Sequence, residues 1–223
     1  MTSRYLNDKL IEAIRADGYD LVAGVDEVGR GCLAGPVTAA AVILPRGIRI
    51  AGARDSKLVP VKNRQELAGQ IKRRALGVGV GWATSAEVDR YGLTWAVATS
   101  AKRALSQLER FHAVLLDGKH NYLKDHCHSR VEIKADDRCL SVACASIVAK
   151  VARDRYMNLQ HKLHPQYGWD SNVGYGTRAH IKAMQQGLSP LHRRRFMPVA
   201  SMELALVSPS RQDAFFERLF DVD

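Results

Sequence analysis

The amino-acid sequence predicts an α/β fold built on a mixed β-sheet. Apolar segments of strand length are interleaved with helical patterns, and their order departs from the strict strand–helix–strand repeat of an all-parallel sheet. The chain has 223 residues, of which 46% are hydrophobic and 25% charged, as in an ordinary globular protein. A chain of this length buries enough surface to fold without disulfides or structural metal ions.

The first half of the chain begins with a helical pattern. Residues 3–17 place Leu6, Leu10 and Ile14 on one helical face, and Gly18 is expected to end the helix. The elements expected next are a strand at 20–26, a strand at 36–44, a helix at 62–75 and a strand at 77–84. Glycine and proline residues bound the strand at 36–44 on both sides, as is typical of strand ends.

The second half contains two strands and three helices. The elements expected are a long helix at 86–110, an apolar strand at 112–116, a short strand at 131–134, a buried helix at 139–163 and a helix at 177–186. Thr177 is the expected N-cap of the last helix, and Gly187 its stop. Residues 165–176 are expected to form a linker.

The predicted organisation is one domain over residues 1–200 with a helical extension from about residue 160. Residues after the linker are too few for an independent core, so we assign them to the same domain. Residues 201–223 form a separate tail, for which we expect an amphipathic helix carrying Phe215, Phe216 and Phe220.

The charge balance is strongly basic. Lys and Arg number 33 against 23 Asp and Glu, which leaves a formal net charge of +10. Residues 46–74 hold nine Lys and Arg against two acids, and residues 171–202 hold five Lys and Arg and no acid. Such basic zones favour an anionic partner, most often nucleic acid.

The remaining composition favours a cytoplasmic protein. The longest uncharged stretch, residues 32–45, is too short to span a membrane, and the N-terminus lacks an apolar signal core. The four cysteines show no CxxC pair and no framework spacing, which suits reduced thiols. Nothing in the sequence demands more than a monomer.

Four acidic residues lie where predicted strands end. Asp26 and Glu27 end the first strand, Asp117 ends the fourth and Asp136 follows the fifth. If the first and fourth strands are parallel neighbours, Asp26 and Asp117 are adjacent. Converging carboxylates require a cation, and oxygen ligands favour Mg²⁺ or Mn²⁺; two such ions would clamp the oxygens of a phosphodiester. In the alternative interpretation, each acid caps a turn or helix, as Asp136 or Asp137 could for the helix at 139.

A glycine-rich turn follows the first two acids. Gly29 and Gly31 let the backbone N–H groups approach a ligand closely, and Arg30 can reach a phosphate. No Gly-Lys-Ser/Thr follows, so the turn is not a Walker loop. The alternative is a plain tight turn into the next strand.

An ordered set of motifs resembles the ribonuclease HII family, the type 2 ribonucleases H. The opening motif is GVDEVGRG at 24–31, followed by CLAGPVTAAAVIL. The other matching stretches are DSKL at 55–58, LLDG at 115–118, KADDRCLSVACASIVAKVARDR at 134–155, GYGT at 174–177 before His180, and LHRRRF at 191–196. The resemblance covers residues 20–200.

The resemblance implies a fold and an activity. The fold is ribonuclease H-like, with a five-stranded mixed sheet flanked by helices and a helical C-terminal extension. The activity is endonucleolytic cleavage of the RNA strand of RNA/DNA hybrids, and nicking of duplex DNA on the 5′ side of embedded ribonucleotides. Two-metal hydrolysis would leave a 3′-OH and a 5′-phosphate.

The resemblance also assigns the metal site. Asp26, Glu27, Asp117 and Asp136 match the four carboxylates that hold Mn²⁺ or Mg²⁺. Asp136 is chosen over Asp137 because it follows Lys134-Ala135. The family usually has Gly where this chain has Ala135, a mild departure unless the backbone there requires positive φ.

Substrate-binding residues follow from the same resemblance. Gly29, Arg30 and Gly31 match the loop that contacts the ribose 2′-OH, and Tyr175 matches the tyrosine that packs on the deoxyribose after the RNA-to-DNA junction. Lys57 and the arginines at 193–195 are candidates for phosphate contacts, with an ordinary solvated basic face as the alternative.

Alternatives from other classes carry distinct signatures. Another ribonuclease H-like enzyme, a 3′–5′ exonuclease or strand-transfer enzyme, lacks the GVDEVGRG and GYGT motifs. A non-catalytic RNA- or hybrid-binding protein would lack one of the four carboxylates, and none is missing.

The His and Cys residues at 126–128 with Cys139 and Cys144 match no standard zinc spacing. Residues 212–216 loosely resemble the glutamine-and-aromatic motif that binds sliding clamps, although a packed helix is the favoured interpretation.

Overall fold

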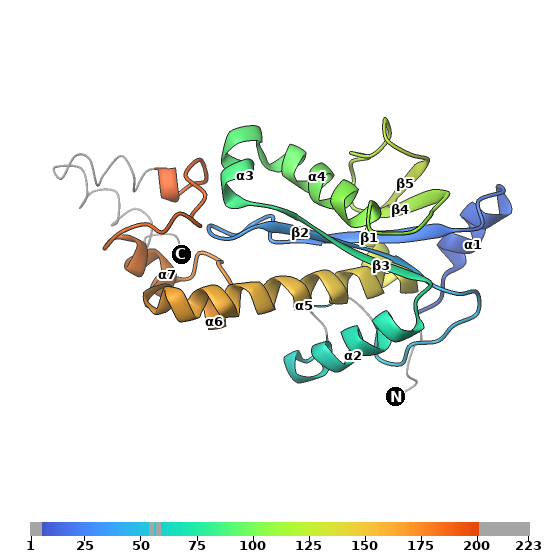
Figure 1. Ribbon diagram of the computed structural model, residues 1–223, viewed down its shortest axis with the longest axis horizontal. Coiled ribbons are helices and arrows are strands. Elements are labelled where there is room, and N and C mark those ends of the chain that lie inside the picture. The colour runs from blue at the N-terminus through green and yellow to red at the C-terminus, as the bar shows by residue number, and fades with distance from the viewer. Residues whose placement is uncertain (1–5, 54–55, 57–58, 201–223) are drawn as a thin grey trace.

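A computed structural model describes residues 6–53, 56 and 59–200. Five strands form one sheet in the order β3-β2-β1-β4-β5 (Figure 1). Their bounds are β1 Val22–Val28, β2 Val37–Ile43, β3 Gly77–Ala83, β4 Ala113–Asp117 and β5 Ser129–Glu132. β1, β4 and β5 are parallel, whereas β2 and β3 run antiparallel to their neighbours. The expected five-stranded mixed sheet is confirmed, and the first and fourth strands are parallel neighbours, which is the condition for Asp26 and Asp117 to be adjacent.

Helices cover both faces of this sheet. The first four are α1 Lys9–Ala16, α2 Val61–Arg74, α3 Ser85–Tyr91 and α4 Leu93–Leu105. The later ones are the short 3-10 helix η1 Ala135–Asp137, α5 Leu140–Leu163, the 3-10 helix η2 Pro165–Tyr167, α6 Trp169–Asn172 and α7 Arg178–Met184. In Figure 1, α4 lies above the sheet, and α5 runs beneath it beside α2.

Alternating side chains of β1 and β2 supply both cores. Ala23, Val25 and Ala41 pack with Ala101 and Ala104 of α4 on one face. On the other face, buried side chains of β2, α2 and α5 share a core; they include Ala40, Val42, Leu67, Ile71, Leu140 and Ile147. Both faces of the central strands are therefore apolar, which explains their continuous hydrophobic runs.

The expected bounds of three elements require correction. α1 begins at Lys9 rather than residue 3, and residues 1–5 lie outside the described part. β1 extends to Val28, because its backbone pairs with β2 as far as Val28↔Thr38. β5 lies at 129–132 rather than 131–134, because its pairing with β4 begins at Val114↔Ser129. Strand ends depend on the partner strand, which local sequence does not reveal.

The expected single helix over 86–110 is two helices. α3 begins after Thr84, whose side chain accepts from the backbone N–H of Glu87 while the Glu87 carboxylate bonds back to Thr84, a capping box. Gly92 ends α3 with φ 88° and starts α4. Such positive φ is accessible to glycine, and the chain turns there.

Residues 165–176 are not a linker. They form η2 and α6, and Tyr167, Trp169 and Val173 enter a core with Met157 and Met184. Thr177 is the N-cap of α7 as expected, accepting from the His180 N–H. The C-terminal helices thus pack on the end of α5 away from α1, as Figure 1 shows.

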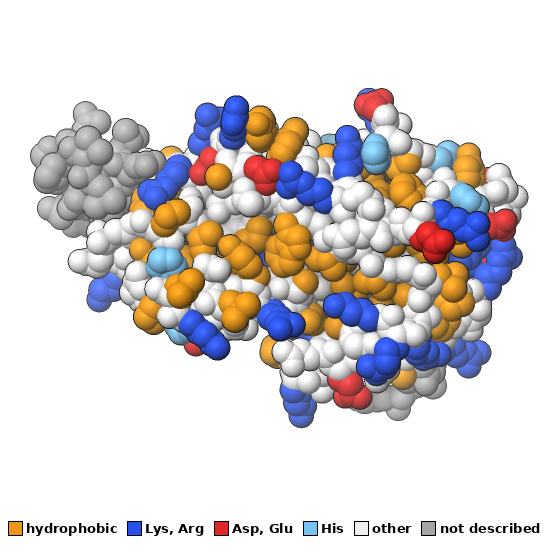
Figure 2. Space-filling model, viewed as in Figure 1, with side chains coloured by type: hydrophobic (Ala, Val, Ile, Leu, Met, Phe, Trp, Pro, Cys, Tyr) orange, Lys and Arg blue, Asp and Glu red, His pale blue; other side chains and the backbone are white. Residues whose placement is uncertain are grey.

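The described surface carries many Lys and Arg side chains. On the face shown in Figure 2, Lys and Arg side chains outnumber acidic ones over and around α2. α2 itself carries Lys62, Arg64 and a basic last turn. No described helix is long and apolar enough to cross a membrane.

Candidate active site

Sheet geometry places Asp26 beside Asp117. β1 and β4 are parallel, with Gly24 opposite Leu115 and Val25 opposite Leu116. Side chains two residues apart on a strand share a face. Asp26 and Asp117 therefore project from the same face of adjacent strands, at their carboxyl ends, as expected from the sequence.

Glu27 projects from the opposite face and is held by two partners. Its carboxylate accepts from Nη1 of Arg30 at 2.9 Å and from Oη of Tyr122 at 3.2 Å. The Glu27 backbone N–H donates to Oδ1 of Asp26 at 2.8 Å. The bonds from Arg30 and Tyr122 hold the Glu27 side chain at the end of β1, and the third orients the Asp26 carboxylate.

Asp136 reaches the site from η1. The left-handed residue before this turn is Lys134, with φ 56°, and Ala135 has no positive φ. Ala135 is buried and its N–H donates to Oδ1 of Asp117 at 2.7 Å. Asp136 is buried while Asp137 is exposed, and neither is the N-cap of α5, which is Cys139.

One cavity of about 350 Å³ collects these residues. Its lining consists of Asp26, Glu27, Val28, Gly29, Arg30, Gly31, Ser56, Asp117, Asp136, Ser146, Lys150 and Tyr175. The structure thus brings together all four carboxylates, the glycine-rich turn and Tyr175. Lys57 lies outside the described residues.

Burial and the neighbouring carboxylates both oppose the ionisation of Asp26. Burial, and then the charge of Glu27, raise the pKa of Asp26 well above its ordinary value, and Asp117 and Asp136 add to the increase. A hydrogen bond with Ser146 acts in the opposite direction on the same pKa. Burial, followed by the charges of Glu27 and Asp26, also raises the pKa of Tyr122, so its phenol stays protonated.

The donor chemistry of the cavity fits a hard divalent cation. Among the described residues, no three His, Cys, Asp or Glu side chains lie close enough together to form a ready-made metal cage. Four carboxylates nevertheless face the same cavity, and their mutual repulsion would be relieved by Mg²⁺ or Mn²⁺. Asp26, Glu27, Asp117 and Asp136 are the residues that could hold such ions.

Sequence reasoning missed the roles of Ser56, Ser146 and Lys150 in the cavity wall, and of Tyr122 behind it. The Oγ atoms of Ser146 and Ser56 are hydrogen-bonded at 3.0 Å, and Lys150 is paired with Asp154 at 2.8 Å. Tyr122 bonds Glu27 from outside any recognised motif. The i, i+4 spacing of Ser146 and Lys150 places both on one helical face soon after Asp136, which is a signal that could have identified them.

Two other groups of candidates do not face the cavity. Arg193 is fully buried, so it cannot contact a substrate phosphate as expected for the arginines at 193–195. Cys139 is also buried, and its Sγ donates to Asp8 at 3.1 Å. Burial raises the pKa of Cys139 and Cys144 above the ordinary thiol value.

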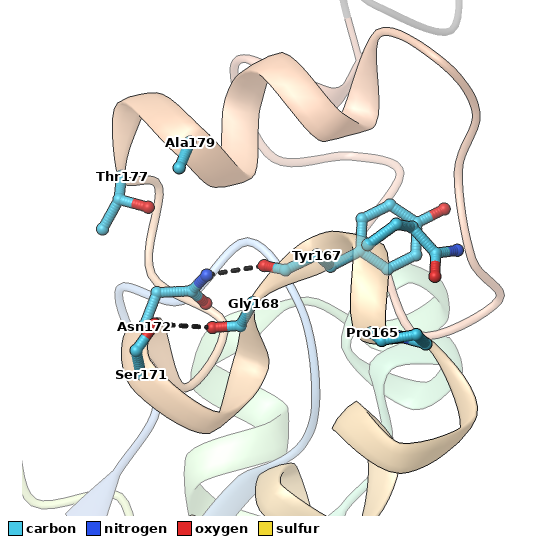
Figure 3. Close-up of a pocket in the computed structure, with 8 residues that line it drawn as sticks. Pro165, Tyr167, Gly168, Ser171, Asn172, Thr177 and Ala179 are labelled. Carbon is cyan, nitrogen blue, oxygen red and sulfur yellow. Dashed lines mark hydrogen bonds between the residues drawn. The ribbon is translucent and has the colours of Figure 1, made fainter.

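The segment before Tyr175 is held by hydrogen bonds of Asn172, which lines a second cavity drawn in Figure 3. Asn172 donates to the carbonyl of Tyr167 at 2.6 Å and accepts from the N–H of Gly174 at 2.8 Å. The neighbouring cavity, of about 360 Å³, lies between α6 and α7 and shares no lining residue with the carboxylate cavity. Nδ1 of His180 bonds to the Tyr175 carbonyl at 2.8 Å.

Carboxylates at the ends of adjacent parallel strands, in a five-stranded mixed sheet and a basic chain, define a nuclease of the ribonuclease H-like class. The family model described as Ribonuclease HII matches residues 23–199. The chain belongs to the ribonuclease HII family. It is accordingly a ribonuclease H, an endonuclease for the RNA strand of RNA/DNA hybrids.

Curated relatives carry the same family name. The chain is 45% identical over 188 residues to a ribonuclease HII of Thermosynechococcus vestitus, covering 83% of this chain and 88% of that protein. It is 48% identical over 184 residues to a ribonuclease HII of Rhizorhabdus wittichii, covering 82% and 91%.

Solved structures show the same fold. The ribonuclease H2 of Pyrococcus horikoshii matches with a TM-score of 0.71 at 24% identity, over 84% of this chain and 99% of that one. The ribonuclease HII in a PCNA complex from Archaeoglobus fulgidus matches with 0.69 at 22%, over 79% and 95%. A ribonuclease HIII in complex with Mn²⁺ matches with 0.65 at 18%, over 85% and 70%.

Proposed function

We propose that this ribonuclease nicks duplex DNA immediately 5′ of an embedded ribonucleotide, in addition to cutting RNA/DNA hybrids. The observation that carries the proposal is the single cavity in which four carboxylates adjoin the Gly29–Gly31 turn and Tyr175. A Cβ placed on Gly31 would lie 4.0 Å from the Tyr175 ring, so the two candidate substrate-binding elements are neighbours.

Hydrolysis would be supported by two divalent ions held by the four carboxylates. Bound there, Mg²⁺ or Mn²⁺ ions would lower the pKa of an attacking water and stabilise the departing 3′ oxygen, leaving 3′-OH and 5′-phosphate ends. Arg30 and Tyr122 orient Glu27, and the Ala135 N–H orients Asp117. A Mn²⁺ complex is described for the related ribonuclease HIII.

Substrate selection would use contacts that distinguish ribose from deoxyribose. The exposed turn at Arg30 and Gly31 can present backbone N–H groups to a 2′-OH. Tyr175 is 41% exposed, and its ring can pack on the sugar that follows. Together they favour a ribonucleotide followed by a deoxyribonucleotide.

The cellular role follows from this preference. Nicking at embedded ribonucleotides would begin their removal during DNA replication and repair, in the reducing cytoplasm that the cysteine pattern favours, by a monomeric enzyme. A sliding clamp is a further candidate partner, since the Archaeoglobus fulgidus relative is described in a PCNA complex. The tail at 201–223, which would make that contact, lies outside the described residues.

The test uses a labelled DNA duplex with one internal ribonucleotide. Wild type, Asp26→Asn and Asp117→Asn are incubated with Mg²⁺, with Mn²⁺ or with EDTA. We expect one metal-dependent nick directly 5′ to the ribonucleotide, lost in both variants. Cleavage of a long hybrid without this nick would refute the junction preference. Mononucleotides released from an end would instead indicate an exonuclease, and binding without cleavage a non-catalytic protein.

A further inference from the structure

Two arginines lie fully buried beneath the candidate substrate-binding elements. Arg153 on α5 and Arg193 after α7 are each 0% exposed. Neither forms an ion pair with any described residue. Burying a guanidinium without a carboxylate at ion-pair distance costs free energy, which its hydrogen bonds must offset. The charge of Asp89 acts on Arg193 from farther away and favours its charged form.

Arg153 binds three backbone carbonyls. Its Nε donates to Pro36 O at 2.9 Å, Nη2 to Ala34 O at 3.0 Å and Nη1 to Val173 O at 2.8 Å. One side chain therefore joins the end of the β1–β2 loop, residues 29–36, to the segment that leads into Tyr175. The loop also packs closely against it, since a Cβ on Gly29 would lie 2.4 Å from Nε of Arg153.

Arg193 spans the same loop from end to end. Its Nη1 donates to Arg30 O at 3.1 Å and its Nε to Gly35 O at 3.0 Å, while Nη2 has no hydrogen-bond partner among the described residues. The guanidinium lies 5.2 Å from the ring centroid of Phe196. Burial, and the nearby charge of Arg153 among further causes, lower the pKa of Arg193 to about 10, so it stays charged at neutral pH.

Backbone hydrogen bonds also join the β1–β2 loop to the Tyr175 segment and to Arg193. The N–H groups of Leu33 and Ala34 donate to Gly174 O at 2.8 and 3.2 Å, and the Arg193 N–H donates to Leu33 O at 2.8 Å. The carbonyls of the β1–β2 loop that bond the two guanidiniums are thus turned toward the protein interior. The conformation of the loop that a ligand would contact at the exposed Gly31 is therefore set by these buried hydrogen bonds.

We propose that Arg193 is a positioning residue for junction recognition, because it fixes both ends of the β1–β2 loop, which is itself bonded to the Tyr175 segment through Gly174 O and Arg153. The inference rests on the proposed function, since it assigns Arg193 to selectivity for an embedded ribonucleotide. Arg193 lines no part of the carboxylate cavity. Its loss should therefore disturb recognition of the junction more than hydrolysis itself.

Two substitutions separate hydrogen-bond geometry from charge. Arg193→Lys keeps the positive charge but loses the planar fork that joins Arg30 O to Gly35 O, and Arg193→Gln loses both. The matched control is Arg15→Gln. Arg15 is another buried arginine that donates to two carbonyls, Asp20 O and Leu44 O, but on α1 at the far end of the sheet, where it also pairs with Glu12 at 2.6 Å.

The measured quantity is kcat/KM for a duplex with one embedded ribonucleotide divided by kcat/KM for a uniform RNA/DNA hybrid. We expect both Arg193 variants to lower this ratio by roughly tenfold or more, because a misplaced loop loses substrate alignment. Arg15→Gln should leave the ratio unchanged even where it lowers the melting temperature. An unchanged ratio in the Arg193 variants, or full retention in Arg193→Lys, would overturn the proposal, as would an equal loss in Arg15→Gln.

Amide hydrogen exchange provides a readout independent of cleavage. Exchange within residues 29–36 and 173–176 should accelerate in Arg193→Gln and not in Arg15→Gln. Unchanged exchange would refute the positioning role. If the wild type fails to nick the embedded ribonucleotide, the proposed function fails and the selectivity role with it, whereas the exchange result still decides whether Arg193 holds the loop.

Discussion

Oδ1 of Asp117 accepts a 2.7 Å hydrogen bond from the backbone N–H of Ala135. The bond ties the end of β4 to η1, the short turn that carries Asp136. Two carboxylates that are 19 positions apart in the sequence are therefore held in one rigid arrangement. The partner of this bond is a backbone group, so it does not depend on which side chain stands at position 135.

The first prediction distinguishes adjacent aspartates. Asp136 faces the cavity and is buried, whereas Asp137 is exposed. We expect Asp136→Asn to lower the rate of hybrid cleavage by about 100-fold or more, because an essential anionic oxygen is lost. Asp137→Asn, the matched control, should stay within about twofold. Steady-state kinetics with Mg²⁺ and with Mn²⁺ measure the cleavage rates of the two variants. A larger loss in Asp137→Asn than in Asp136→Asn would assign the site to Asp137 instead.

The second prediction concerns the stability of the metal-free protein. The pKa of Asp26 is raised by burial and then by Glu27, so the folded state disfavours its ionisation. The contribution of Asp26 to stability is therefore greatest below its unfolded pKa and is lost as pH rises toward its folded pKa. In EDTA at about pH 8, Asp26→Asn should raise the free energy of unfolding by about 1–3 kcal/mol.

Urea denaturation of wild type and Asp26→Asn near pH 5 and near pH 8 supplies the measurement. The stability difference between the two proteins should be larger at the higher pH. A difference that shrinks as pH rises would contradict the assigned direction of the Asp26 pKa.

The third prediction concerns acid sensitivity of the C-terminal core. Burial, and then the charge of His180, lower the pKa of His192 to about 3. A lowered histidine pKa leaves stability intact above the unfolded value near 6.5 and removes it as pH falls toward 3. Wild type should lose roughly 1.4 kcal/mol per pH unit at this site between those limits.

His192→Gln removes the titrating ring and provides the comparison for that slope. Its free energy of unfolding should be lower at neutral pH, because the bond from the Ser189 N–H to Nδ1, 2.9 Å long, is lost. It should also fall less steeply with acid than that of the wild type. Parallel pH profiles for the two proteins would exclude His192 as the source.

The fourth prediction tests the left-handed residue before η1. Lys134 has φ 56° and ψ 44°, a conformation that costs a side chain with a Cβ. Lys134→Gly should therefore stabilise the protein by about 0.5–1 kcal/mol. Ala135→Gly should not, because Ala135 has no positive φ. Thermal denaturation of both variants provides the measurement. Stabilisation by Ala135→Gly and not by Lys134→Gly would contradict the assignment of the backbone strain to Lys134.

The fifth prediction separates the ring of Tyr175 from its hydroxyl. If the ring packs on a sugar, Tyr175→Phe should retain most cleavage at an embedded ribonucleotide, and Tyr175→Ala should lose about tenfold or more. Cleavage of a uniform hybrid should fall less in both. Equal losses in the Phe and Ala variants would assign the contact to the hydroxyl instead.

Much of the site follows from local sequence. Strands at 36–44 and 77–84 are recognisable from their apolar composition and bounding residues, and both agree with β2 and β3 within one residue at each end. The four carboxylates stand out because acids follow apolar segments in a basic chain. Only the family motif distinguishes Asp136 from Asp137 as the fourth carboxylate, because the two adjacent side chains are chemically identical.

Other features could not be inferred locally. Gly92 interrupts a continuous helical pattern, and the break becomes evident only from its backbone angle. Arg193 stands among three consecutive arginines that all suggest a solvated basic face, yet one is fully buried. Nothing in the residue type distinguishes it, because its partners are backbone carbonyls, some more than 150 positions away.

The sequence by itself determined the α/β class, the family and the four acidic residues, because hydrophobic periodicity and short motifs are local properties. The tertiary structure decided which groups meet. It placed Asp26 beside Asp117 through strand register, joined the Tyr175 segment to the β1–β2 loop, and buried Arg153 and Arg193 beneath both. The physical reason is that pairing and burial depend on contacts between distant segments, which local propensity does not encode.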